Sequence, residues 1–104
     1  MSKVNSVFDK ITALDSIREL RLFIDNDYIL YQSRFIPMIE NLKRKVKRGV
    51  YDHQKAPKLF IYLVDVGARK YCADFGGTVR QCFPKAVREA VAQEYADEFK
   101  ESYL

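Results

Sequence analysis

Apolar side chains recur every three or four positions from residue 16 to residue 48, the longest periodic stretch in the chain. This spacing places them on one face of an α-helix. The turn-like run Asp25–Asp27 can cap a restarted helix, and Pro37 lacks the backbone N–H that an unbroken helix needs. We therefore predict helices at about 16–25 and 27–48, the second bent at Pro37 and ended by a glycine. The apolar positions are Ile17, Leu20, Ile24, Tyr28, Tyr31, Phe35, Met38, Leu42 and Val46, and the glycine is Gly49.

The first fourteen residues carry a shorter amphipathic pattern that predicts a separate short helix. Ser16 is followed three residues later by Glu19, which matches a capping box at the start of a new helix. We therefore expect the chain to turn near Asp15. The apolar face of the short helix comprises Val4, Val7, Phe8, Ile11 and Leu14.

The longest apolar run, KLFIYLVDV at residues 58–66, is compatible with a buried strand or with a helix buried on most sides. Its spacings of three and four continue as far as Phe75, which favours a helix. Pro57 suits a first helical turn, and Gly76 and Gly77 supply a left-handed stop. We predict a central helix at about 57–75. Its main stripe is Ala56, Phe60, Val64, Gly67, Tyr71 and Phe75, with Leu59, Tyr62, Leu63 and Val66 in a second stripe beside it.

Beyond the glycine pair the pattern predicts two more elements. Thr78 and Gln81 match a second capping box, which indicates a turn or short helix at 78–82. Pro84 suits the first position of a final helix. That helix sets apolar residues four apart, at Val87, Val91, Tyr95 and Phe99.

Composition agrees with a helical protein in one domain, residues 1–104. Only three prolines and four glycines interrupt the chain, and 48% of its residues are hydrophobic. We predict a compact all-α bundle of four or five helices. The alternative is a small α+β domain with residues 58–66 as a strand. The expected centre of the bundle is Phe60, Leu63, Val64 and Tyr71.

Basic residues are concentrated in residues 43–58, called the basic segment below. The chain has a net charge of +4, yet this segment holds seven cations against Asp52 alone. Cations at the end of a helix complement its dipole, but five of them in the six residues KRKVKR exceed that need. Such clusters contact acidic proteins or phosphates. The seven candidate binding residues are Lys43, Arg44, Lys45, Lys47, Arg48, Lys55 and Lys58.

Three interpretations of the basic segment stay open. It forms a solvated helix end, it docks on a protein partner with an acidic surface, or it binds nucleic acid with Tyr51 and His53 stacked on bases. The acidic carboxyl end allows three more: a solvated face, a surface that repels polyanions, or a partner for the basic segment of a second copy in a homo-oligomer. The acids are Glu89, Glu94, Asp97, Glu98 and Glu101.

The residue types that support catalysis or metal binding are scarce. His53 is the only histidine, and no nucleophile lies beside it in the sequence. Cys72 and Cys82 lack the spacing of a zinc site, which favours two reduced thiols, with a disulfide as the alternative. We predict a non-enzymatic protein without metal or cofactor. The sequence shows no apolar span and no signal layout, so we expect no membrane association and a cytoplasmic location.

The run YDHQKAPKLFIYLVDVGARKYCADFGG, followed by FPKAVREAVAQEYADEF, resembles short accessory proteins encoded by phages and plasmids. The similarity covers Tyr51 to Phe99, about half of the chain. It implies expression in a bacterial host cytoplasm and a mode of action by binding, and often inhibiting, a host macromolecule. The resemblance lies in helical packing positions, so it assigns a function to no single residue.

Overall fold

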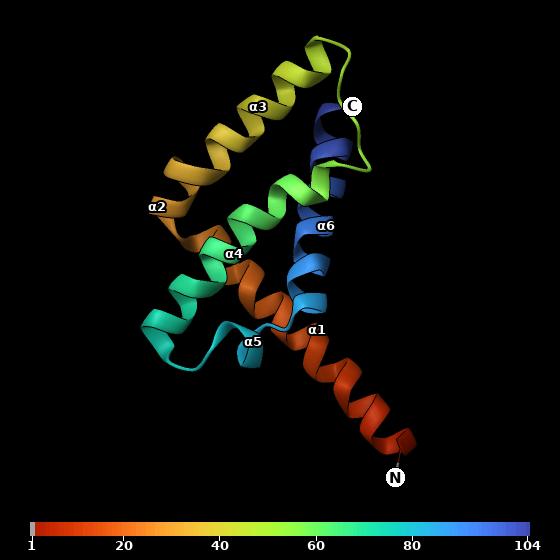
Figure 1. Cartoon of the computed structure of the whole chain (residues 1–104), viewed down its shortest axis with the longest axis vertical. Helices are drawn as coiled ribbons and strands as arrows, with labels where there is room; N and C mark the ends of the chain where they lie inside the picture. Colours follow the sequence, from red (N-terminus) through yellow and green to blue (C-terminus); the bar gives the residue numbers. More distant parts are fainter. Residues whose placement is uncertain (1) are drawn as a thin grey trace.

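The computed structural model describes the backbone of residues 2–104 and the side chains from residue 13 onward. Throughout residues 2–104 the regular elements are helical (Figure 1), so the all-α prediction is confirmed. The alternative of a strand at 58–66 is wrong, because these residues lie inside one long helix. The elements are α1 (Ser2–Asn26), α2 (Tyr28–Leu30), the π-helical turn η1 (Tyr31–Phe35), α3 (Ile36–Lys47), α4 (Ala56–Phe75), α5 (Val79–Cys82) and α6 (Lys85–Tyr103).

The core lies where α4 packs against α6. Phe60 of α4 stacks on Tyr95 of α6, with ring centroids 5.8 Å apart. The small side chains Ala92 and Ala96 are buried on α6, which lets the two helices approach closely. Burying each large apolar side chain contributes about 1.5–3 kcal/mol, and many such side chains meet here. The predicted centre is confirmed for Phe60, Leu63 and Val64, which are all buried.

Tyr71, the fourth residue of the predicted centre, lies at the edge of the core. Its ring packs edge-on against Phe83 at 4.9 Å, and its hydroxyl donates a hydrogen bond to Glu19 Oε1 at 2.5 Å. The predicted stripes of α4 are also wrong at Tyr62 and Phe75, which are 67% and 69% exposed. Phe75 is the last residue of α4, where the periodic pattern continues beyond the core.

The turn expected near Asp15 is wrong, because α1 is one continuous helix from Ser2 to Asn26. Ser16 and Glu19 fit a capping box, but neither residue type breaks a helix interior, and no Gly or Pro lies between them. Of the apolar face predicted for the first fourteen residues, positions 4–11 fall outside the described side chains, and the prediction is wrong at Leu14, which is 64% exposed. In Figure 1 the amino-terminal part of α1 extends past the other helices, which agrees with a longest dimension of 52 Å.

Gly67 marks the crossing of α1 over α4. A Cβ atom at this position would lie 2.5 Å from Cγ1 of Ile24, and Ile24 is itself buried. A helix-interior glycine costs roughly 0.5–1 kcal/mol relative to alanine. The close approach of the two helices explains why a glycine stands in the α4 stripe.

The restart predicted after Asp25–Asp27 is confirmed at Asp27. Its Oδ1 accepts the backbone N–H of Leu30 at 2.9 Å, and Lys70 Nζ of α4 lies 2.6 Å from its Oδ2. The interruption predicted at Pro37 takes the form of η1, in which the N–H of Ile36 reaches back to the carbonyl of Tyr31. This wider turn shifts the hydrogen-bond register just before Pro37, so the chain accommodates the missing donor and continues as α3.

The remaining helix boundaries follow their predicted signals closely. Pro57 lies in the first turn of α4, and Gly76 and Gly77 have φ of +92° and +85°. Thr78 Oγ1 accepts the N–H of Gln81 at 3.2 Å and so caps α5. Pro84 precedes the final helix instead of occupying its first position, since α6 begins at Lys85.

Candidate docking surface

The end of α3 is closed by its own backbone. Gly49 has φ +75°, as predicted for the residue that ends this helix. Its N–H donates to the Val46 carbonyl at 3.1 Å, and the Val50 N–H donates to the Lys45 carbonyl at 2.9 Å. This pair of bonds is a Schellman motif, which satisfies carbonyls that a helix end otherwise leaves open. The cations of the last turn are therefore not needed as hydrogen-bond caps.

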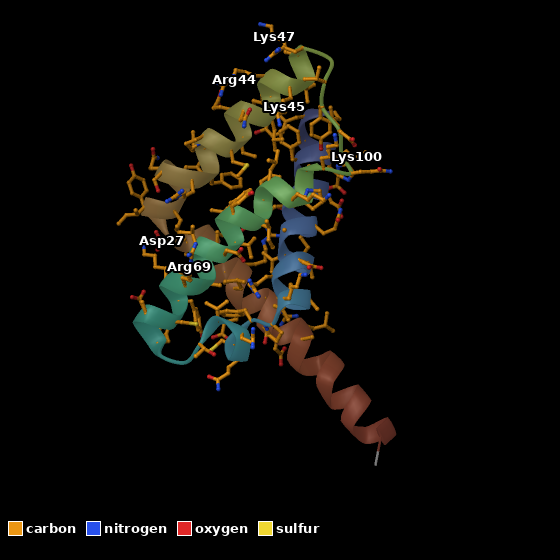
Figure 2. The ribbon with its side chains drawn as sticks, in the orientation of Figure 1. Asp27, Arg44, Lys45, Lys47, Arg69 and Lys100 are labelled. Atoms are coloured by element: carbon orange, nitrogen blue, oxygen red, sulfur yellow. The ribbon has the colours of Figure 1, made fainter. Side chains whose placement is uncertain are left out.

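The cations of α3 point in different directions. Arg44, Lys47 and Arg48 are exposed, and their spacing of three and four places them on the outer side of the helix; these three residues are called the docking face. Lys43 instead turns towards α6, where its Nζ lies 4.5 Å from the ring centroid of Tyr103. Lys45 is half-buried. Figure 2 shows Arg44, Lys45 and Lys47 together at the carboxyl end of α3.

The connection from α3 to α4 is held against α6 by two aromatic residues. Tyr51 packs on Phe99 with ring centroids 5.4 Å apart. Its Oη lies 3.0 Å from Nδ1 of His53, whose Nε2 lies 3.1 Å from Oδ1 of Asp97. Burial raises the pKa of Tyr51, and the charges of Asp52 and Asp97 add to the effect. Both rings predicted to stack on bases are thus engaged within the chain.

The last two cations lie at the start of α4. Lys55 precedes the helix and is exposed, and Lys58 stands at the rim of a groove between α4 and α6. This α4–α6 groove has a volume of about 590 Å³. Its apolar part is formed by Pro57, Ile61, Tyr62 and Ala92, and its polar part by Gln54, Lys58, Lys85, Glu89 and Gln93.

The α4–α6 groove could not be predicted from the sequence, because its two walls are about 30 residues apart along the chain. The exposed ring of Tyr62 on α4 and the short side chain of Ala92 on α6 both line the groove. A small residue in a helix pattern predicts close packing, and Ala92 and Ala96 are indeed both buried. Only the placement of α4 shows that Ala92 also borders a groove.

The cations of the basic segment and the acids of α6 differ in their partners. Among the side chains from residue 13 onward, none of the seven cations forms an ion pair with a carboxylate. Four of the five acids of α6 do have a partner. Glu94 and Glu98 lie 2.9 and 2.5 Å from Nη1 of Arg21. Asp97 contacts His53, and Glu89 lies 3.7 Å from Lys85.

Arg21 is the centre of the acidic cluster, which joins α1 to α6. Its guanidinium lies 4.2 Å above the ring of Tyr95, and Tyr95 donates its hydroxyl to Asp25 at 2.7 Å. Burial acts to lower the pKa of Arg21, but the hydrogen bond to Glu98 and the neighbouring charges outweigh it and raise the value. Burial and the bond to Asp25 raise the pKa of Tyr95. Arg21 therefore stays charged and Tyr95 stays neutral at neutral pH, and the cluster acts as a structural joint.

Neither a metal centre nor a membrane span is found in the described residues. From residue 13 onward no group of three or more His, Cys, Asp or Glu side chains is placed to hold a metal ion. The helices within residues 2–104 are too short or too polar to cross a bilayer.

The chain matches no protein-family model, no curated protein and no solved structure. The arrangement of charges on the bundle is therefore the observation from which a function is inferred.

Proposed function

We propose that this chain is a small non-enzymatic binding protein that docks on an acidic surface of another protein through the basic segment. The observation that carries the proposal is the unpaired state of the seven cations, among the described side chains, in a chain whose acids are mostly paired. The Schellman motif after α3 removes one structural reason for keeping cations there. A partner that supplies carboxylates would complete this surface.

The surroundings of the cations fit a protein partner. Val50, next to the docking face, is 60% exposed, and the exposed Tyr103 and Leu104 end the neighbouring helix. Lys58 connects the basic segment to the α4–α6 groove, which has an apolar floor. Protein interfaces combine apolar contact at their centre with charged residues at the rim. We therefore expect the partner to present carboxylates together with at least one apolar side chain.

Nucleic-acid binding is the alternative, and it has less support. Tyr51 and His53 are bound to α6 and to each other, which leaves no free aromatic platform in the basic segment for bases. Asp97 contacts His53 at the middle of that segment. A carboxylate so close lowers the positive potential that attracts a polyanion. Docking on a folded protein surface acts through short-range contacts, so it is less sensitive to this decrease in positive potential.

The resemblance to phage and plasmid accessory proteins suggests the class of partner. We propose that the partner is a host protein in a bacterial cytoplasm, and that docking blocks one of its own contacts. A protein that blocks a contact of its partner needs no catalytic residues, because binding alone produces the effect.

The proposal is tested by capture from a bacterial lysate with three forms of the full chain. The first is the wild type, and the second replaces the docking face (Arg44→Gln, Lys47→Gln, Arg48→Gln). The third removes the same charge elsewhere (Arg18→Gln, Arg69→Gln, Arg80→Gln), at exposed residues without an ion pair among the described side chains. The captured protein is then purified, and its affinity for each form is measured at two salt concentrations.

We expect the docking-face variant to bind at least tenfold more weakly and with a flatter salt dependence, since rim charges govern association and its response to salt. The control variant should bind like the wild type. Equal binding by both variants contradicts the proposal. Displacement of the captured protein by duplex DNA, with a log–log salt slope of roughly 0.9 per phosphate contact, would favour the nucleic-acid alternative.

A further inference from the structure

The two cysteines are neighbours at the carboxyl end of α4. Cys72 lies in the last turns of this helix, and Cys82 ends α5. The Gly76 N–H donates to the Cys72 carbonyl at 2.8 Å, and the Cys82 thiol donates to the Gly76 carbonyl at 3.9 Å. The turn at residues 76–78 thus folds the Cys82 sulfur back towards the end of α4 that carries Cys72, close enough for Cys82 to contribute to the raised pKa of the Cys72 thiol.

The glycine pair is what makes this arrangement possible. Gly76 and Gly77 both have positive φ, which a residue with a side chain rarely adopts. They differ in their surroundings, because a Cβ atom on Gly77 would lie 2.8 Å from Sγ of Cys82, whereas one on Gly76 would meet nothing within 4 Å. Gly77 therefore leaves the space that the Cys82 sulfur occupies.

The thiol pair lies partly open to solvent and has no third ligand. Both cysteines are half-buried, so a small reagent reaches them without unfolding the chain. Burial, helped by the hydrogen bond to Cys82, raises the pKa of the Cys72 thiol. Within the described side chains, no His, Asp or Glu joins the two cysteines in a metal-binding group. A chemistry that uses two sulfurs alone is the one the geometry supports.

We propose that Cys72 and Cys82 form a reversible intramolecular disulfide, which fastens α5 to the end of α4. The oxidant is a low-molecular-weight disulfide such as oxidised glutathione. One cysteine thiolate attacks a sulfur of the oxidant and releases one thiol, which gives a mixed disulfide. The second cysteine thiolate attacks the protein sulfur of that bond and releases the other thiol. Two protein thiols become one disulfide, and the oxidant is reduced to two thiols.

The bond requires little rearrangement. The turn already brings the Cys82 sulfur to 3.9 Å from the Gly76 carbonyl, four residues after Cys72, so we expect side-chain rotation to bring the sulfurs to the S–S length of about 2.05 Å. A disulfide that closes even a short loop restricts the unfolded chain, so the oxidised chain should melt about 10 °C higher than the reduced one. This clamp lies at the end of α4 away from the cations of α3 (Figure 1), so it is independent of the proposed docking.

The test equilibrates the folded full chain in glutathione buffers of increasing oxidised fraction, followed by acid quenching and alkylation with a maleimide. Intact mass then counts free thiols, mixed disulfides and chain dimers. We expect a monomeric species that carries neither glutathione nor maleimide and that recovers both thiols on reduction. The single variants Cys72→Ser and Cys82→Ser should instead give glutathione adducts. Wild-type chain that shows only free thiols, glutathione adducts or dimers overturns the proposal.

A pair of glycine variants tests whether the turn sets the oxidation. Gly76→Ala and Gly77→Ala strain the backbone in the same way, but only the second displaces the Cys82 sulfur. We expect Gly77→Ala to lower the equilibrium constant for disulfide formation about tenfold relative to Gly76→Ala, a difference of about 1.4 kcal/mol. Equal constants, or a higher constant for Gly77→Ala, would show that the placement of the two sulfurs does not depend on this turn.

Discussion

The acidic face of α6 and the basic end of α3 are charge clusters of similar size with opposite relations to the rest of the molecule. Glu94 and Glu98 reach across to Arg21 of α1, and Asp97 holds the connection before α4 through His53. The cations of α3 make no ion pair among the described side chains. The acids thus join elements of the fold through ion pairs, and the cations of α3 do not.

The different partners of the two clusters explain why α6 carries acids near its carboxyl end, which the sequence alone does not explain. Acids near the carboxyl end of a helix oppose its dipole, so the dipole of α6 does not stabilise Asp97 and Glu98. Their benefit lies in contacts with α1 and with His53. The basic end of α3 is the reverse case, because its charges suit the helix dipole but exceed what the dipole requires. A local rule therefore explains neither cluster, and the contacts distinguish them.

The largest expected effect comes from removing the centre of the acidic cluster. Arg21→Met should lower the free energy of unfolding by roughly 2–3 kcal/mol, since hydrogen bonds to charged groups contribute about 1.5–3 kcal/mol and three carboxylates lose their common partner. Arg18→Met, one turn earlier and exposed, is the matched control and should change stability by less than about 0.5 kcal/mol. Urea titrations measure both. Similar values for the two variants would mean that the cluster does not join α1 to α6.

A smaller effect is expected at the ion pair between Asp27 and Lys70, and it depends on pH. The hydrogen bond to Lys70 and the N–H of Leu30 lower the pKa of Asp27 in the folded chain. Its stabilising contribution is therefore complete above the ordinary value of about 3.9 and is lost as the pH falls through the lowered value. Asp27→Asn keeps a good capping residue but cannot pair with Lys70.

Stability measured from pH 7 down to pH 2 tests this pair. We expect Asp27→Asn to cost about 1 kcal/mol at pH 7 and to converge with the wild type at the acid end. The exposed Asp74→Asn serves as the control and should follow the wild type throughout. A constant difference between Asp27→Asn and the wild type at every pH would contradict the assignment.

Local signals in the sequence predicted the boundaries of the helices well. Asp27, Gly49, Gly76 and Thr78 each act through bonds to residues within a few positions, so their roles can be recognised without knowledge of the fold. The failure at Ser16 is equally instructive. The same residue pattern can occur at the start of a helix or in its interior. Which of the two forms depends on whether the segments on either side bury more apolar surface as one straight helix. In α1 the helix is continuous, and Leu20 and Ile24, which follow the capping-box residues, are buried in the core.

The sequence predicted which residues form the basic segment, but not the directions in which their side chains point. The sequence located all seven cations, yet it could not separate Lys43, which turns towards Tyr103, from Arg44 on the outer side. It also missed Arg21, whose partners Glu94 and Glu98 lie 73 and 77 positions later. Contacts over such separations depend on how α1, α4 and α6 cross. A periodic pattern indicates a buried face but does not indicate which helix covers it.

The smallest effects are expected within the basic segment, where they distinguish its two kinds of cation. Lys43→Gln should lower stability by about 0.5–1 kcal/mol, because it removes the cation–π contact with Tyr103. Arg44→Gln, at the next position, should change it by less than about 0.5 kcal/mol, since glutamine keeps a high helix propensity and no contact is lost. Thermal melts of the two single variants measure the difference. Unfolding by Arg44→Gln would mean that the outer side of α3 supports the fold and is not available to a partner, which would remove the contrast with the acidic cluster.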